Sequence, residues 1–420
     1  MTAKLGKKWL VLSHAFNMDG RAASQTITDK IPHLLNAGIT PIVISAMTGR
    51  RDAQLEHYQL LPIGPAGLRF DLRHVLNQYW GKGMRYRLVM LLSTLLLATG
   101  IILEKLLWQR ESQWSWWWPA YRKGLQLIRE GKVDVIYSTG GAYAAHVAAA
   151  KLKQKTGLPW IAEVHDPLVK PETAPKTDQE KMQAEVERLI CRFADYPFWF
   201  TDQALASARL RQPQLGERGF VILPGADAPT ESLPAYQVTD KMVIGHFGSL
   251  SPTRHLADII QAIAALEPKI RQCIELHVYG SELDSHTAST LKNYDQAVVV
   301  RCHGWLKRQV VLERMKTTDV LLLQHGIEPM CAEYIPSKLY EYLWMQRPIL
   351  GLIYRNPQLT AMLNSLGHYA VPANDIVAQT DRIHSLFKAW QQSNGLADNG
   401  LESPFTTEGA VKALLNRVMC

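Results

Sequence analysis

The chain has 420 residues, of which 47% are hydrophobic and 20% are charged. This composition excludes a disordered or collagen-like protein, and the length predicts two or three domains. None of the five cysteines belongs to a Cys-x-x-Cys pair. Their placement argues against a disulfide scaffold or a cysteine zinc site and favours a reducing, cytoplasmic compartment.

The net charge of +8 is concentrated in one segment. Between Arg69 and Lys132, eleven Lys or Arg residues stand against four Asp or Glu residues, which leaves an excess of seven positive charges. The same segment contains six of the twelve tryptophans. A basic, Trp-rich segment around an apolar run is typical of a membrane surface. We expect no nucleic-acid partner, because neither a zinc-finger spacing nor a basic heptad accompanies the charge.

Short apolar runs alternate with amphipathic helical patterns, which predicts α/β architecture with parallel sheets and helices on both faces. The first series of expected strands covers residues 9–13, 41–45, 133–138, 160–164, 197–201 and 219–223. The second series covers residues 242–247, 274–279, 298–302, 320–323 and 349–353. Helical patterns include residues 25–37, 179–194, 256–266, 337–345 and 405–418. The apolar run at 9–12 is too short for a signal-peptide core and fits a first strand better.

The two series of strands predict two Rossmann-like domains that face each other across a cleft. A stretch rich in Pro, Gly and polar residues separates them and reads as a linker. The expected organisation is an N-terminal domain at 1–223, a linker at 224–240, a C-terminal domain at 241–395, and a tail with a final helix at 396–420 that packs back toward the N-terminal domain. In open α/β sheets, ligands bind beyond the carboxyl ends of the strands.

The stretch Leu88–Leu103 is almost uniformly apolar and lies in an insert at about 68–122 of the N-terminal domain. A helix that is apolar on all sides suits a protein core or lipid. A single crossing would separate the first two strands from their partners, and a spanning helix needs ~20 apolar residues. We therefore expect a helix or helical hairpin that dips into one leaflet, on the inner face of the cell membrane, as in a peripheral or monotopic protein. The flanking tryptophans would lie at the interface and the flanking cations at the headgroups: Arg85, Arg87, Lys105 and Arg110. The alternative is a core helix.

The most specific motif contains two carboxylates eight positions apart, Glu333 and Glu341. Pro336 suits the first turn of a helix, which would leave the N–H groups around Ser337–Leu339 free to bind a diphosphate. Lys338 can add positive charge. Glu341 would then accept hydrogen bonds from ribose hydroxyls, and Glu333 would bind hydroxyls of a donor sugar. The alternative is an ordinary capped helix with two solvated glutamates.

This motif resembles the E-x7-E signature of retaining glycosyltransferases with the GT-B fold, and of glycosyltransferase family 4 in particular. Its Pro-Ser-Lys-Leu-Tyr-Glu-Tyr sequence is similar to that of bacterial members that build surface polysaccharides. Further stretches resemble the family in the expected order: Phe16–Ser24, Glu163–Pro167, Val221–Asp227, Ile244–Arg254, Val278–Gly280 and His303–Gly304. The resemblance covers nearly the whole chain apart from the insert. It implies that the domain at 1–223 binds the acceptor and that the domain at 241–395 binds the nucleotide sugar.

The resemblance implies donor-binding roles for Gly248, Ser249 and Arg254. The family usually has an arginine and, later, a lysine that contact the donor diphosphate. Here Ser249 stands in the first place and Arg254 matches the second. One phosphate contact is therefore missing or replaced, and Lys338 or His255 could replace it.

The resemblance also implies a role for His165, beside the reacting sugar. Together with Glu333 it is our candidate catalytic residue, and the alternative is a histidine satisfied by local backbone, with Asp166 as a cap. His325 is expected to line the donor pocket near the base or the sugar, although histidines are common where loops begin.

Residues that follow the first expected strand are candidates for acceptor binding. His14 ends that strand, and the loop after it contains Asp19, Gly20 and Arg21. The family often has Gly-Gly in this loop. Arg21 in its place could meet an anionic acceptor or could be a solvated loop residue.

The expected function is transfer of a sugar from a nucleotide-diphosphate sugar to a saccharide or lipid-linked acceptor, in surface polysaccharide or glycoconjugate synthesis. No Asp-x-Asp motif is present, so we expect no metal and no cofactor other than the donor substrate. The resemblance implies retention of configuration, by a front-face mechanism in which the leaving phosphate takes the acceptor proton. Two alternatives remain open: another enzyme on the same fold, such as a nucleotide-sugar epimerase or a glycogen-type synthase, and a non-catalytic membrane-bound scaffold of a polysaccharide assembly complex.

Overall fold

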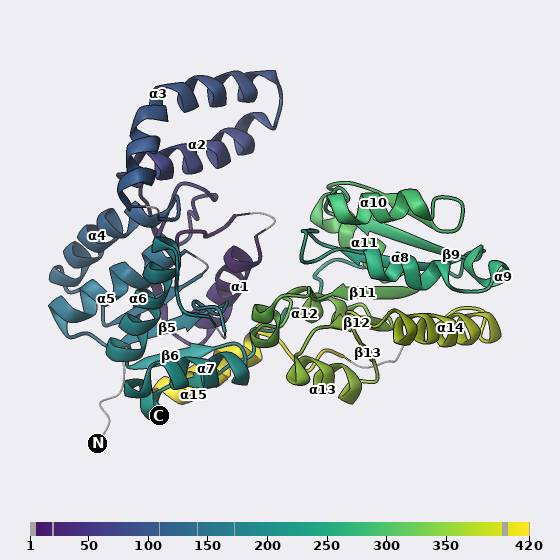
Figure 1. Ribbon diagram of the computed structural model, residues 1–420. Coiled ribbons are helices and arrows are strands. Elements are labelled where there is room, and N and C mark those ends of the chain that lie inside the picture. The colour runs from purple at the N-terminus through teal and green to yellow at the C-terminus, as the bar shows by residue number, and fades with distance from the viewer. Residues whose placement is uncertain are drawn as a thin grey trace. The chain divides into compact units, whose positions relative to one another are not determined.

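A computed structural model describes residues 6–18, 21–108, 110–140, 142–171, 173–396 and 402–419. The chain divides into two compact units. Unit 1 comprises Met1–Pro224 together with Thr407–Cys420, and unit 2 comprises Gly225–Thr406. Each unit contains one parallel sheet, so the prediction of an α/β fold with two parallel sheets is confirmed (Figure 1).

The sheet of unit 1 has the strand order β3-β2-β1-β4-β5-β6-β7, and all its pairs are parallel. Its strands are β1 Lys8–Leu12, β2 Thr40–Ser45, β3 Glu56–Gln59, β4 Val135–Thr139, β5 Trp160–Val164, β6 Tyr196–Trp199 and β7 Phe220–Val221. Its helices are α1 Ala22–Asn36, α2 Pro65–Trp80, α3 Met84–Trp108, α4 Trp117–Arg129, α5 Tyr143–Thr156, α6 Asp178–Phe193, α7 Asp202–Arg211 and α15 Thr407–Met419. Two 3-10 helices, η1 Trp114–Trp116 and η2 Pro213–Arg218, complete it.

Strand β1 shows why both faces of this sheet are covered. Successive side chains of a strand point to opposite faces. Leu10 and Leu12 pack into a core with residues of α4, α5 and α6. Trp9 and Val11 pack into a second core with residues of α1 and α15. A strand that is apolar at every position therefore requires helices on both sides.

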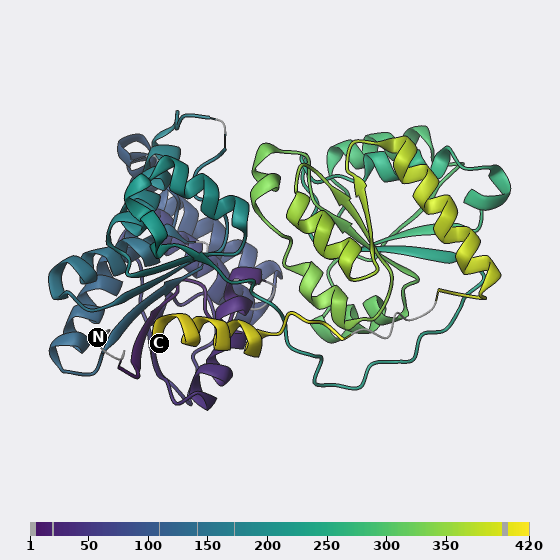
Figure 2. The same cartoon turned by 90° about the horizontal axis from the view of Figure 1, so that it is seen from below.

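The last helix, α15, belongs to unit 1 although unit 2 precedes it in the chain. It packs beside α1, and its buried Ala410, Val411 and Leu414 fill the second core. Figure 2 shows α15 in yellow next to the purple segments of unit 1. The two ends of the described chain thus contribute to one sheet-and-helix layer.

The sheet of unit 2 has the strand order β10-β9-β8-β11-β12-β13 and is also parallel. Its strands are β8 Met242–Phe247, β9 Ile274–Tyr279, β10 Val299–Cys302, β11 Val320–Gln324, β12 Ile349–Ile353 and β13 Tyr369–Pro372. Its helices are α8 Ala257–Ala264, α9 Pro268–Arg271, α10 Ser285–Asn293, α11 Arg308–Thr317, α12 Lys338–Trp344, α13 Pro357–Ser365 and α14 Ile376–Gln392, with the 3-10 helix η3 Pro329–Glu333.

The order of strands in unit 2 reverses between β8 and β11. The chain adds β9 and β10 on one side of β8 and then crosses to β11 on the other side. Ligands of open α/β sheets bind beyond the carboxyl ends of the strands at such a reversal. Unit 1 has the corresponding reversal between β1 and β4.

Helices α2 and α3 form an antiparallel hairpin that projects from the rest of unit 1 (Figure 1). Helix α3 has 25 residues, and an 18-residue stretch within it has a mean hydropathy of 2.0, so by length and composition it could cross a membrane. It is longer than the apolar run suggested. Only Met90 and Glu104 of this helix are buried, so the alternative of a core helix is wrong.

The base of this hairpin is polar. The two Glu104 carboxylate oxygens accept hydrogen bonds from the Ala66 N–H, at 2.9 Å, and from the Trp114 indole. The Ser115 hydroxyl accepts the Gly64 N–H at 2.8 Å. The bonds of Glu104 to Trp114 and of Ser115 to Gly64 therefore attach the base of the hairpin to η1.

The expected position of the whole tryptophan cluster at a membrane interface is wrong for Trp116. Its side chain is fully buried in the core with Leu10 and Leu12, and its indole donates to the Leu60 carbonyl at 3.2 Å. Packing therefore explains this tryptophan without a membrane. Trp80, Trp108 and Trp118 remain exposed on the hairpin or at its base.

Candidate functional site

The loops after β8 and β11 meet at the strand reversal of unit 2. Strands β8 and β11 are neighbours, with Ile244 opposite Val320. The Ile327 N–H donates to the Thr253 carbonyl at 2.9 Å, so the two loops are joined by backbone. Gly326 has φ +111°, which a residue with a side chain rarely adopts, and a Cβ there would approach Thr253. The close approach of these loops therefore depends on a glycine.

A hydrogen-bond chain fixes Arg254 in this place. Its Nη2 donates to the Tyr334 hydroxyl at 3.0 Å, and that hydroxyl donates to the His325 carbonyl at 3.2 Å. Within the part of the chain that the structure describes, the buried Arg254 Nε has no hydrogen-bond partner. One face of this guanidinium therefore remains able to bind an anion.

Gly248 and Ser249 lie directly after β8, at the carboxyl edge of the sheet. The Gly248 N–H donates to the Tyr279 carbonyl at 2.9 Å, so this donor is already used. Ser249 is exposed. Ser249 therefore places a small hydroxyl group at the carboxyl edge of the sheet, at a position where the family that the sequence resembles has an arginine.

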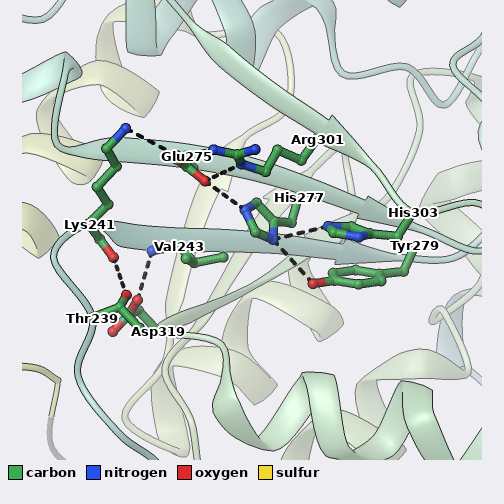
Figure 3. Close-up of polar contacts among 9 residues, drawn as sticks. All are labelled: Thr239, Lys241, Val243, Glu275, His277, Tyr279, Arg301, His303 and Asp319. Atoms are coloured by element: carbon green, nitrogen blue, oxygen red, sulfur yellow. Dashed lines mark hydrogen bonds and ion pairs between the residues drawn. The ribbon is translucent and has the colours of Figure 1, made fainter.

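Aromatic rings from neighbouring strands extend the same edge. The Tyr279 ring stacks on Phe247 at 4.5 Å and on His303 at 4.3 Å. Figure 3 shows how a polar chain runs back along β9 from here, through His277, to Glu275. Glu275 pairs with Arg301 at 2.6 Å and with Lys241 at 3.1 Å. The Arg301 hydrogen bonds outweigh burial and hold the Glu275 pKa well below its usual range.

Helix α12 begins at Lys338, later than expected, so Pro336 is not in its first turn. Ser337 is the N-cap, and the Leu339 N–H donates to the Pro336 carbonyl at 3.0 Å. The expectation that the Leu339 N–H is free is therefore wrong, because a tight i→i+3 turn uses it. The helix has only seven residues, so side-chain charge matters more here than the helix dipole.

Glu341 lies between two cations. Its Oε1 accepts from Arg308 Nη1 at 2.9 Å, and its Oε2 accepts from Lys338 Nζ at 2.5 Å. Burial alone would raise the pKa of Glu341, but Lys338 and then Arg308 outweigh it and lower that pKa. Glu341 is thus an ionised carboxylate that holds Lys338 at the start of α12.

Glu333 and His325 are both buried, at 2% and 0% exposure. Glu333 ends η3, in the segment before α12. His325 accepts the Tyr354 N–H at Nδ1, at 3.4 Å, and its Nε2 donates to the Tyr334 carbonyl at 3.1 Å. Burial lowers its pKa to about 4, so the ring is neutral. Because both ring nitrogens are used, the arrangement favours a structural role for His325 over ligand binding.

Tyr342 is a positioning residue that the motif did not indicate. Its hydroxyl accepts the Phe247 N–H at 3.2 Å and donates to the Leu322 carbonyl at 3.3 Å. It therefore ties α12 to the ends of β8 and β11. A buried tyrosine in an apolar helix gives no sequence signal that distinguishes this role from packing.

In unit 1, His165 follows β5 at the carboxyl edge of the sheet. Its Nε2 lies 2.9 Å from Thr139 Oγ1 and 3.2 Å from Glu163 Oε1, and its ring stacks on Phe200 at 4.8 Å. The pocket that it lines with Gly140, His146 and Asp166 is about 50 Å³. His165 is thus held in place by side chains, and not by local backbone alone.

Behind His165 lies a buried cluster that the motifs did not indicate. Glu163 accepts hydrogen bonds from the Tyr137 hydroxyl and from Lys30 Nζ, the latter at 2.5 Å. Lys30 also lies 5.6 Å from the centre of the Phe198 ring. Burial alone would raise the pKa of Glu163, but the charge of Lys30 and the bonds from His165 hold it far below its usual range. The cluster places the Lys30–Glu163 ion pair beneath His165.

His14 ends up in the interior of unit 1, between the rings of Phe70 and Trp116. Its Nε2 lies 3.6 Å from Asp71 Oδ1 of α2. Burial lowers the pKa of His14 to about 3 and raises that of Asp71 to about 7. His14 thus has no access to an acceptor in this state. Arg21 is exposed as the N-cap residue of α1, whereas Asp19 and Gly20 lie outside the described residues.

Across the described ranges, no group of three or more His, Cys, Asp or Glu side chains could hold a metal ion. The site in unit 2 instead gathers Arg254, Arg308 and Lys338 near the strand reversal. Cations and hydrogen-bond donors in this arrangement can neutralise a diphosphate.

The sequence matches no protein-family model and no curated protein. Solved structures do match the fold. The lipopolysaccharide outer core galactosyltransferase WaaB is 13% identical, with 98% of each chain covered and a TM-score of 0.58. WaaG, a glycosyltransferase involved in lipopolysaccharide biosynthesis, is 14% identical, with 90% of each chain covered and a TM-score of 0.54.

TarM of S. aureus, solved with fondaparinux, α-GlcNAc-glycerol and UDP, is also similar in fold. It is 12% identical with a TM-score of 0.53, and the match covers 72% of this chain. This chain spans 59% of the length of the TarM chain. At these identities the similarity shows the fold alone, which is the two-sheet GT-B fold of these glycosyltransferases.

Proposed function

We propose that the protein transfers a sugar from a nucleoside-diphosphate sugar to a saccharide or lipid-linked acceptor. The observation that carries the proposal is the hydrogen bond between Arg254 and Tyr334, which joins the loops after β8 and β11 at the strand reversal. It holds the Arg254 guanidinium, whose Nε has no partner among the described residues, beside the segment between Glu333 and Glu341. The GT-B fold, shared with WaaB and WaaG, supports the same reaction class.

In the proposed site, Arg254 and Lys338 bind the diphosphate, and Glu341 keeps Lys338 in place. Glu341 is also the proposed partner of the ribose hydroxyls, and Glu333 that of the donor sugar. The bond from the anomeric carbon to the diphosphate oxygen breaks, and a bond from the same carbon to the acceptor oxygen forms. The acceptor proton passes to the leaving phosphate, with retention of configuration. The chain's own cations stabilise the leaving charge, so the proposed step uses no metal.

In unit 1, we propose that His165 lies beside the reacting sugar and that Arg21, on the exposed end of α1, meets an anionic acceptor. The negative Glu163 beneath His165 supports this role, because it favours a proton on the imidazole nitrogen that faces it. The exposed apolar helix α3 and its flanking arginines support an acceptor that is presented at a membrane surface, from the cytoplasmic side.

A binding screen tests this proposal. Thermal unfolding of the full chain is measured with UDP, GDP, UDP-glucose, UDP-galactose and GDP-mannose. We expect at least one nucleotide to raise the unfolding temperature, and Glu341→Ala to weaken that effect. Absence of any shift would favour a non-catalytic scaffold. Epimer formation without an acceptor would identify an epimerase instead.

A further inference from the structure

The pocket beside His165 contains a second histidine, His146, that none of the proposed steps uses. The pocket is about 50 Å³ and is lined by residues of β5, α5 and the loops after β4 and β5: Gly140, Tyr143, His146, Val164, His165, Asp166, Pro167 and Leu168. His146 lies one turn into α5 and is 1% exposed. It reaches the pocket because its neighbours on this face are alanines, which let α5 pack closely on the sheet.

The hydrogen bonds of His146 determine which ring nitrogen carries the proton. The Trp160 indole can only donate, and it donates to Ser138 Oγ at 2.8 Å. Ser138 Oγ also lies 2.9 Å from His146 Nδ1. Ser138 Oγ has two acceptor positions, but among the described residues Nδ1 is the one acceptor that the structure shows for its own proton. We therefore assign the hydroxyl as an acceptor from the indole and a donor to Nδ1. Nδ1 is then the acceptor, and the proton of a neutral imidazole lies on Nε2.

His146 Nε2 has no hydrogen-bond partner within the described ranges. Burial and, to a smaller extent, the charge of His165 lower the pKa of His146 to about 3, so the ring is neutral. A buried N–H donor without an acceptor is costly in a protein interior. The pocket that His146 lines is the place from which an acceptor can come.

The lining of the pocket selects the kind of acceptor. Among the described residues no Lys or Arg lines it, and the acidic residue Asp166 does. An anionic group would be repelled by this carboxylate and would find only a neutral donor. A hydroxyl group fits both, because it can accept from His146 Nε2–H and donate to Asp166. A volume of about 50 Å³ is enough for a group of this size.

We propose that this pocket binds one hydroxyl or hydroxymethyl group of a saccharide substrate and that His146 Nε2–H is its donor. The inference rests on the proposed function, because it supplies a specificity contact for the same reaction. Gly140, which lines the pocket, has φ +106°, a conformation that a residue with a side chain rarely adopts. The saccharide is either the donor sugar or the acceptor, and the test separates the two.

The first experiment observes the imidazole directly. The full chain is labelled with 15N-histidine, and long-range 1H–15N spectra are recorded alone and with UDP, UDP-glucose, UDP-galactose, free glucose and free galactose. His146→Leu assigns the signal. We expect a neutral ring protonated on Nε2. A shift with a UDP-sugar but not with UDP assigns the pocket to the donor, and a shift with a free sugar assigns it to the acceptor. A ring protonated on Nδ1 would overturn the proposal.

The second experiment measures affinity. We expect His146→Leu to raise the dissociation constant of the sugar-bearing ligand about tenfold and to leave that of UDP unchanged. His146→Gln, which keeps an N–H donor, should recover part of the loss. His57→Gln is the matched control, since His57 is equally buried in unit 1 but has partners on both ring nitrogens. Far-UV circular dichroism and thermal unfolding establish that the variants fold.

The outcomes separate the two proposals. If UDP-sugars bind and the His146 signal and affinities do not change, the pocket assignment is wrong while the proposed function stands. If no nucleotide and no sugar binds, the proposed function fails, and the pocket assignment fails with it.

Discussion

Lys30 Nζ lies 2.5 Å from Glu163 Oε1 in the interior of unit 1, where the two side chains are 2% and 0% exposed. A charge of each sign is thus removed from water and compensated by the other. The pair joins α1 to β5 directly beneath His165. An uncompensated buried charge is costly. The pair therefore couples the packing of α1 to the position of His165 at the carboxyl end of β5.

The first prediction concerns this pair. Lys30→Met leaves Glu163 buried without its cation and should lower the free energy of unfolding by about 3–5 kcal/mol. Chemical unfolding followed by circular dichroism measures this. The double variant Lys30→Met/Glu163→Gln removes both charges and should recover a substantial part of the loss. A single variant as stable as the parent would show that the pair does not carry the packing of α1.

A second prediction concerns Arg254. We propose that its guanidinium donates a charge-assisted hydrogen bond to the diphosphate. Arg254→Ala should therefore weaken UDP binding about tenfold to a hundredfold, corresponding to about 1.5–3 kcal/mol. Arg254→Lys keeps the charge but loses the bond to Tyr334, and should recover only part of the affinity. Isothermal titration calorimetry measures both. Arg301→Ala, on edge strand β10, is the control and should leave the affinity unchanged.

A third prediction concerns pH. Glu111 accepts the Tyr143 N–H at 3.0 Å, and burial raises its pKa to about 8. The folded protein therefore holds a proton that the unfolded chain, with a carboxyl pKa of ~4.3, releases. The free energy of unfolding should fall as the pH rises from about 4.5 to about 8, where the folded carboxyl ionises.

Glu111→Gln keeps an oxygen for the Tyr143 N–H but has no charge. We expect this variant to lose part of that slope and to gain stability relative to the parent above pH 8. Urea unfolding at pH 5, 6.5 and 8.5 measures the difference. Glu217→Gln, at a side chain that is 99% exposed, is the control. Parallel pH profiles for the parent and Glu111→Gln would contradict the prediction.

A fourth prediction concerns α3. Leu95, Leu96 and Leu106 are 64%, 82% and 70% exposed, and each would contribute about 1.5–3 kcal/mol if buried in lipid. Changing all three to serine should lower the partition coefficient on anionic vesicles more than about a hundredfold in a flotation assay. High salt should also weaken binding, because the flanking residues are basic. Leu210→Ser is the control: this leucine is 84% exposed on α7. Equal flotation of the triple variant and the parent would rule out α3 as the membrane contact.

The architecture could be predicted because most of its strands are short runs of mainly apolar residues. β5, β8, β9 and β12 begin and end where their apolar runs do. Strand β3 was missed because its Glu-His-Tyr-Gln sequence has no apolar run. It forms because Leu60 N–H and the Ser45 carbonyl continue the pairing with β2. An edge strand needs little apolar surface, so its sequence carries little signal.

The candidate site could be predicted only where a motif marks it. The residues around Glu333 and Arg254 lie at the expected edge, but the start of α12 depends on a turn that the sequence does not determine. Lys30 could have been noticed, since it falls between Ile27 and Ile31 on the buried face of α1. A lysine in that position requires a buried acid, but which acid depends on the tertiary fold. His146 lies among alanines and gives no such signal.

The polar base of the α2–α3 hairpin has a mechanical consequence. Glu104 accepts from the Trp114 indole and Ser115 accepts the Gly64 N–H, so the base of the hairpin is hydrogen-bonded to η1 of unit 1. These bonds oppose tilting of the hairpin relative to the sheet of unit 1. A chain with α3 embedded in a bilayer would be held at a set height and tilt. If the proposed acceptor lies in the same bilayer, its reactive hydroxyl would have to stand at the height above the headgroups at which the hairpin holds the site. The hairpin would then select acceptors by that height.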